Sequence, residues 1–264
     1  MKMVSIGDIN LNVLDRGSGG IPILFVHGFP LDHTMWRRQS DYFSDHERVI
    51  VPDLRGFGKS GVTKGTVTME QHADDLAKLL DALHVDEPII YCGLSMGGYI
   101  GWQFWKQHRE RLRGLVQCDT RALPDTKEAA ANRLQQAERV VVEGSGFVAD
   151  AMLPRLFAAE TIAEQPEMVA AMERIMRATP SEGIAAAARG MAMRENFIEQ
   201  IEQIDVPTLI VVGEHDAIAP PEEMQTIADA IPEAVWLQVP GAGHMAPLEN
   251  PTVFNDGLAE FITM

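Results

Sequence analysis

The chain has 264 residues, 46% of them hydrophobic, and a formal net charge of −16. This length and apolar content fit one large α/β domain with an insertion, and no run of about 18 uncharged apolar residues marks a membrane span. The acidic charge argues against nucleic acid or an anionic membrane as a partner, because polyphosphate binding needs a basic surface, and it is most simply a source of solubility.

The first segment, Met3–Leu14, alternates apolar and polar residues, which predicts an antiparallel hairpin at a sheet edge. It carries Asp8 and lacks the uninterrupted apolar stretch of a signal peptide, so we expect a cytoplasmic protein. The later apolar runs are continuous, which is typical of strands buried on both faces of a mostly parallel sheet. They are Ile23–Val26, Arg48–Val51, Ile89–Cys92, Gly114–Cys118, Thr208–Val212 and Ala234–Val239.

Helical patterns lie between these runs, which predicts helices packed on the sheet. Thr68 begins a capping box ahead of a helix over 69–83. Another helical pattern, 96–108, follows a strand directly. Asn250 stands before a proline and is a suitable N-cap for a last helix that extends through Phe261.

The stretch 121–204 lacks strand signals and is rich in alanine and methionine. We expect it to form a helical cap, inserted into an α/β core made of residues 1–120 and 205–264. Its methionines either fill the interior of the cap or form an adaptable apolar ceiling over a pocket. The sequence leaves both interpretations open.

The strongest chemical motif is Gly93-Leu94-Ser95-Met96-Gly97, which stands between a buried run and a helical pattern. A nucleophile elbow requires this context, with small residues at the flanking positions because the turn is tight. The helix N-terminus behind the serine favours developing negative charge. The motif therefore predicts that Ser95 is a nucleophile.

A serine nucleophile needs a base, and the base needs a carboxylate that orients it. At an elbow of this kind the partners follow in the order serine, acid, histidine. His244, in the small-residue segment Gly241–His244, is the candidate base because it lies after the last predicted strand. Asp216 is the preferred acid, and Asp119 is the alternative because it follows the neighbouring strand.

An oxyanion hole is the remaining requirement. Its predicted donors are the backbone N–H groups of Met96, which follows the nucleophile, and Phe29, in the loop after the first buried run. Their side chains are then free to line the pocket. We expect them to form an apolar acyl-binding site together with Trp36.

The other histidines and the cysteines suggest no further chemistry. His27 is expected to brace its loop, and no histidine pair has the spacing of a metal site, so neither a catalytic metal nor a cofactor is expected. Cys92 and Cys118 each end an apolar run, as buried reduced thiols do. The histidines assigned to surface helices or loops are His46, His72, His84 and His108.

Five segments, in this order, resemble those of the α/β-hydrolase superfamily. They are HGFP at His27–Pro30, DLRGFGKS at Asp53–Ser60, GLSMGG at Gly93–Gly98, GEHD at Gly213–Asp216 and GAGH at Gly241–His244. The resemblance implies the α/β-hydrolase fold, an eight-stranded mostly parallel sheet flanked by helices, with an inserted helical cap. Within the superfamily, the chain is similar to serine carboxylesterases, haloperoxidase-type perhydrolases and 3-oxoadipate enol-lactonases.

These observations together predict a serine hydrolase that cleaves carboxylic esters of short-to-medium acyl chain through an acyl-enzyme, without a cofactor. A lactonase is the alternative, with Arg121 or Arg194 pairing the carboxylate of an anionic ring. A carbon–carbon bond hydrolase and a non-catalytic ligand receptor on the same fold also stay open. The expected partner is a small ester or lactone, and the question of a homo-oligomer is left open.

Overall fold

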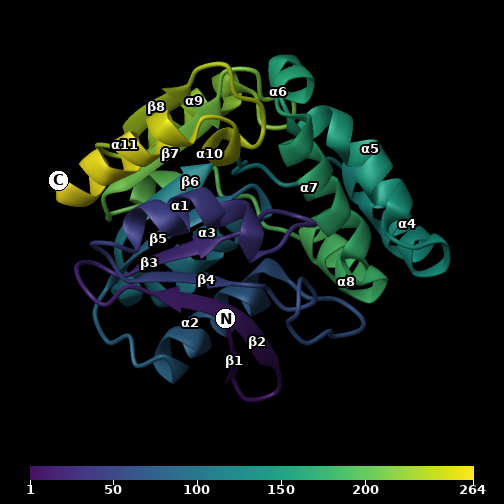
Figure 1. The fold of residues 1–264 in the computed structure, drawn as a ribbon, viewed down its shortest axis with the longest axis horizontal. Coiled ribbons are helices and arrows are strands. Elements are labelled where there is room, and N and C mark those ends of the chain that lie inside the picture. Colours follow the sequence, from purple (N-terminus) through teal and green to yellow (C-terminus); the bar gives the residue numbers. More distant parts are fainter.

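A computed structural model describes residues 1–264 and places eight strands in one sheet (Figure 1). The strand order is β1-β2-β4-β3-β5-β6-β7-β8, in which only β1 and β2 run antiparallel to their neighbours. The predicted edge hairpin and the mostly parallel sheet are therefore confirmed. The strands are β1 (Lys2–Ser5), β2 (Asn10–Arg16), β3 (Ile23–Val26), β4 (Val49–Pro52), β5 (Ile89–Leu94), β6 (Leu112–Cys118), β7 (Thr208–Gly213) and β8 (Val235–Val239).

The continuous apolarity of the central strands reflects burial on both faces. For β8 the prediction of full burial is wrong, because this strand lies at the sheet edge and only Val239 is buried. In β3, Leu24 and Val26 belong to one core cluster, and Ile23 and Phe25 belong to the other. Helices cover both clusters, so neither face of the central strands meets water. The first cluster includes residues of α2 (Met69–Ala82), α3 (Met96–His108) and α9 (Pro221–Ala230), and the second includes residues of α1 (Arg37–Phe43) and α11 (Pro251–Thr263).

Two predicted helix starts are confirmed by their capping contacts. The side chain of Thr68 accepts a hydrogen bond from the backbone N–H of Gln71 at 3.2 Å, and α2 begins at the next residue. Asn250 accepts from Val253 N–H at 3.4 Å at the start of α11. Each cap satisfies a backbone donor that the helix itself leaves unpaired.

The prediction of a surface position for His72 is wrong. This residue lies on the buried face of α2, one helical turn from Met69 and Leu76, and its side chain is completely enclosed. Both ring nitrogens lack a hydrogen-bond partner. Burial lowers the pKa of His72 to about 3, so the ring is neutral at physiological pH.

Between β6 and β7 the chain forms five helices, which lie together at one end of the molecule beyond the sheet (Figure 1). They occupy the stretch for which a helical cap was predicted. No helix of the chain has the length and apolarity required to cross a membrane. The five are α4 (Lys127–Glu143), α5 (Gly146–Leu156), α6 (Ala159–Glu164), α7 (Pro166–Ala178) and α8 (Ser181–Ala192).

Candidate active site

Ser95 lies in a sharp turn between β5 and α3. Its backbone has φ 55° and ψ −109°, a conformation that L-residues rarely adopt and that the surrounding packing must hold in place. A Cβ atom at Gly93 would lie 2.3 Å from the carbonyl oxygen of Gly97, and one at Gly97 would lie 2.4 Å from the carbonyl oxygen of Val26. The turn therefore requires glycine on both sides of the serine, as the motif predicted.

The substitution Gly97→Ala is expected to lower the free energy of unfolding by about 3 kcal/mol or more, because backbone atoms cannot move aside for the added methyl group. Gly146→Ala is the matched control, since its Cβ would approach only the flexible tip of Arg177, at 3.1 Å. Urea unfolding measures the difference. Equal stability of the two variants would contradict the close packing at the elbow.

A chain of hydrogen bonds joins three segments that are far apart in the sequence. His244 Nε2 lies 2.9 Å from Ser95 Oγ, and His244 Nδ1 lies 2.8 Å from Asp216 Oδ2. The imidazole and the carboxylate are buried, with residue exposures of 2% and 4%, whereas Ser95 is half-buried. This arrangement can pass the serine proton to the imidazole and stabilise the charge that results.

The Asp216 carboxylate is held in its ionised form. Burial by itself would raise the pKa of Asp216, but the imidazole of His244 and two backbone N–H donors outweigh it, and the pKa lies below its usual value. The donors are Ile218 at 2.7 Å and Ala219 at 3.0 Å, both to Oδ1. Oδ2 is thus left to face the imidazole.

Asp119, the alternative acid, makes no hydrogen bond to the imidazole. Its Oδ1 accepts the N–H of Gly213 at 2.8 Å, and its buried Oδ2 has no partner. Burial and the nearby charge of Asp216 raise the pKa of Asp119 well above its usual value. Asp119 therefore holds the start of the loop that carries Asp216, rather than orienting His244.

The two predicted oxyanion donors are Met96, within the elbow, and Phe29, in a loop that passes beside it. A Cβ atom at Gly28 would lie 3.4 Å from Ser95 Cβ, so the loop that carries Phe29 passes directly beside the nucleophile. Neither Phe29 N–H nor Met96 N–H donates in any hydrogen bond of a turn, loop or cap. Both groups can therefore serve an external oxygen atom.

His27 braces this loop, as its position in the sequence predicted. Its ring is fully buried, with Nδ1 2.9 Å from the carbonyl oxygen of Gly28 and Nε2 3.0 Å from the backbone nitrogen of Leu54. Burial lowers the pKa of His27. The neutral ring can thus donate to Gly28 and accept from Leu54 at the same time.

The expected contribution of Trp36 to the acyl-binding site does not hold in the structure. Its side chain is fully buried in the core, with its ring centroid 4.9 Å from that of Phe25 and 6.0 Å from that of Phe254. The Met96 side chain is likewise enclosed. A short 3-10 helix, His33–Trp36, turns the indole toward the sheet, which a pattern of neighbouring residues could not show.

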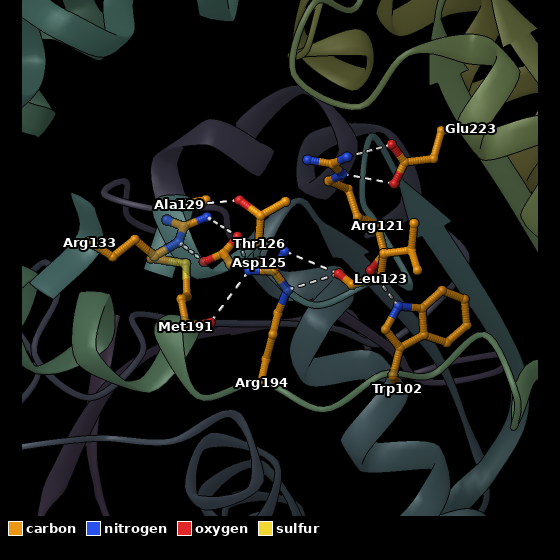
Figure 2. A network of polar contacts seen from close by, with 10 residues as sticks. All are labelled: Trp102, Arg121, Leu123, Asp125, Thr126, Ala129, Arg133, Met191, Arg194 and Glu223. Carbon is orange, nitrogen blue, oxygen red and sulfur yellow. Dashed lines mark hydrogen bonds and ion pairs between the residues drawn. The ribbon is translucent and has the colours of Figure 1, made fainter. Parts of the chain in front are cut away.

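Arg121 and Arg194, the candidate partners of a substrate carboxylate, already bind acidic residues of the protein (Figure 2). Arg121 forms a bidentate pair with Glu223, at 2.8 and 2.7 Å. Arg194 is buried against Asp125 at 2.8 Å, and its guanidinium lies over the ring of Tyr99. The role expected for Arg121 in binding substrate is therefore not supported by its contacts.

One cluster of side chains has the donor types of a metal site, although no histidine spacing had indicated it. Asp32, His33 and Asp53 offer ligand atoms within 4.8 Å of one another. Asp53, however, already accepts four hydrogen bonds, two from His33, one from Asn12 and one from Lys59. Burial would raise the pKa of Asp53, but these donors lower it to about 2. The ionised carboxylate therefore has a structural role, in which it joins the segments that carry these donors.

The two cysteines behave as predicted. Cys92 and Cys118 are buried and unlinked, with their sulfur atoms 3.9 Å apart on the neighbouring strands β5 and β6. Burial raises the pKa of the Cys118 thiol well above its usual value. Both thiols therefore pack as small apolar groups.

Sequence reasoning missed Glu249, in the four-residue helix α10 (Ala246–Glu249). Its carboxylate is 8% exposed and accepts the backbone N–H groups of Gly243, Met245 and Ala158. The one available signal was an acidic residue at the end of the apolar stretch that follows His244. That signal does not identify the groups that the carboxylate binds.

Comparisons with known proteins identify the family of the chain and several similar proteins. A family model described as "alpha/beta hydrolase fold" matches residues 21–251. A thermophilic esterase from Thermogutta terrifontis is 45% identical, with a TM-score of 0.96 over 100% of this chain and 97% of its own. The enol-lactonase from Burkholderia xenovorans LB400 is 28% identical, with a TM-score of 0.92 over 100% of both chains. The 3-oxoadipate enol-lactonase 2 of Acinetobacter baylyi is 28% identical over 94% of this chain and 91% of its own.

Proposed function

Because the chain belongs to the alpha/beta hydrolase family, we propose that it cleaves carboxylic esters of short-to-medium acyl chain through an acyl-enzyme on Ser95. The hydrogen-bond chain from Ser95 through His244 to Asp216 is the observation that carries this proposal. The 45% identity to an esterase adds support.

In the proposed reaction, Ser95 Oγ attacks the ester carbonyl while His244 Nε2 accepts its proton. The N–H groups of Phe29 and Met96 stabilise the oxyanion of the tetrahedral intermediate, each by about 3 to 4 kcal/mol if they act like the donor measured in subtilisin. The alcohol leaves with the proton from Nε2. Water then repeats these steps on the acyl-enzyme, and Asp216 stabilises the imidazolium each time.

A lactonase is the second candidate, supported by the enol-lactonases among the relatives. The contacts of Arg121 and Arg194 favour an uncharged substrate, because both guanidinium groups are already neutralised. An anionic ring would have to displace Glu223 or Asp125. We therefore place neutral esters first and neutral lactones second. Hydrolysis rates for p-nitrophenyl esters of increasing acyl length, beside a lactone series, test this order.

The substitution Glu223→Gln is expected to shift selectivity toward anionic substrates, because it frees the guanidinium of Arg121. Arg121 follows Thr120, whose hydroxyl donates to the carbonyl oxygen of Ser95 at 2.8 Å, so the backbone from which the arginine side chain extends lies close to the elbow. For a half-exposed ion pair we expect about a fivefold rise in kcat/KM for an ester with a free carboxylate, relative to its neutral methyl ester.

The double variant Glu223→Gln with Arg121→Gln is the control and should lose this gain. A wild-type preference for the anionic ester that Arg121→Gln abolishes would contradict the assignment of neutral substrates.

A further inference from the structure

Glu249 binds the backbone on both sides of His244. Its Oε1 accepts the N–H of Gly243 at 2.9 Å and the N–H of Met245 at 3.1 Å. These are the two residues next to the histidine in the chain, so one carboxylate oxygen binds the 242–243 and 244–245 peptide groups, which lie on either side of His244.

The other oxygen of Glu249 binds the helical insertion. Oε2 accepts the N–H of Ala158 at 2.8 Å, in the segment that connects α5 to α6. A Cβ atom at Gly243 would lie 2.5 Å from the nitrogen of Ala158 and 3.2 Å from Glu249 Oε1, so this contact requires glycine before the histidine. Glu249 thus binds both the insertion and the loop that carries His244.

A catalytic base must be held in a closely defined position, and the contacts of Glu249 can hold His244 in this way. His244 Nε2 stands 2.9 Å from Ser95 Oγ, and a misplacement of about 1 Å at such a site can lower the rate about a hundredfold. The 244–245 peptide group borders His244 and the 242–243 peptide group lies one residue earlier, so their common acceptor limits the backbone dihedral angles of Gly243 and His244. The direction of the His244 side chain follows from those angles.

We propose that Glu249 is a positioning residue, which sets the place of His244 with one oxygen and couples it to the α5–α6 segment with the other. This inference rests on the proposed role of His244 as the general base. It also implies that movement of the insertion at Ala158 changes the distance between the base and the nucleophile.

The variant Glu249→Gln separates the two oxygens. Its amide keeps one acceptor, so it can serve either the histidine loop or Ala158, and its NH₂ group then faces a backbone donor. We expect kcat for p-nitrophenyl butyrate to fall about 10- to 100-fold while KM changes less than about threefold, with a larger fall in Glu249→Ala. Asp75→Asn is the matched control, because Asp75 is another buried carboxylate but pairs with Arg55. It should lower Tm and leave kcat unchanged.

Hydrogen exchange in the inactive Ser95→Ala background tests the coupling without any activity. In Glu249→Ala, the amides of Gly243, Met245 and Ala158 should all exchange faster, whereas in Asp75→Asn they should not. A kcat within twofold of wild type in both Glu249 variants would overturn the positioning role. Unchanged exchange at Ala158 would overturn the coupling. If the wild-type protein hydrolyses no ester, the proposed function fails, and the exchange experiment still decides whether Glu249 joins the two segments.

Discussion

Ser95→Ala is expected to abolish ester hydrolysis and labelling by a fluorophosphonate probe. The substitution removes the oxygen atom that forms the proposed acyl-enzyme, and it removes the proton that His244 Nε2, 2.9 Å away, is proposed to accept. Loss of the nucleophile in subtilisin lowers kcat about a million-fold, and we expect a loss of the same order here. Steady-state hydrolysis of p-nitrophenyl butyrate and gel detection of the labelled protein measure the two effects.

Ser181→Ala, at the start of α8, is the control and should label and hydrolyse as the wild type does. Labelling that persists in Ser95→Ala would place the nucleophile elsewhere. A wild-type protein that neither labels nor hydrolyses would favour a ligand receptor on the same fold. Cleavage of a carbon–carbon bond, without ester cleavage, would favour a carbon–carbon bond hydrolase.

Asp216→Asn is expected to lower kcat about 10⁴-fold, as the corresponding change does in trypsin. Asparagine can donate from its amide to His244 Nδ1, which favours the wrong tautomer of the ring and removes the charge that stabilises the imidazolium. Hydrolysis rates and a thermal unfolding curve separate this chemical effect from a loss of folding.

Asp119→Asn is the matched comparison, because the two carboxylates are buried side by side at the ends of neighbouring strands. The amide oxygen of asparagine can still accept from Gly213, and we expect kcat to stay within about threefold, since no imidazole contact is lost. A large loss of kcat in Asp119→Asn, together with a small loss in Asp216→Asn, would show that Asp119 is the acid that orients His244.

The raised pKa of Asp119 also predicts a dependence of stability on pH. A carboxyl group whose pKa is higher in the folded protein stabilises the fold below its unfolded pKa of about 3.9 and loses that contribution as pH rises through the folded pKa. Asp119→Asn cannot ionise. The Tm of this variant minus the Tm of the wild type should therefore increase as the pH rises above about 4. Thermal unfolding at several pH values measures this difference.

Local signals in the amino-acid sequence were enough to predict several strands, a helix start and the elbow. Continuous apolar runs mark strands such as β3 and β5 because both faces of these strands are buried, and Thr68 marks the start of α2 because a cap needs only the next three residues. The elbow at Ser95 belongs to the same group, since its geometry depends on small residues within two positions.

The contacts between distant segments could not be predicted, because they depend on how the whole chain packs. Arg121 and Glu223 stand 102 positions apart, and Ala158 and Glu249 stand 91 apart, so no periodicity joins them. The side of the sheet toward which Trp36 turns was likewise not determined by its neighbours. Local patterns report which residues prefer burial or a turn, whereas the partner of a charged or aromatic side chain depends on how the whole chain packs.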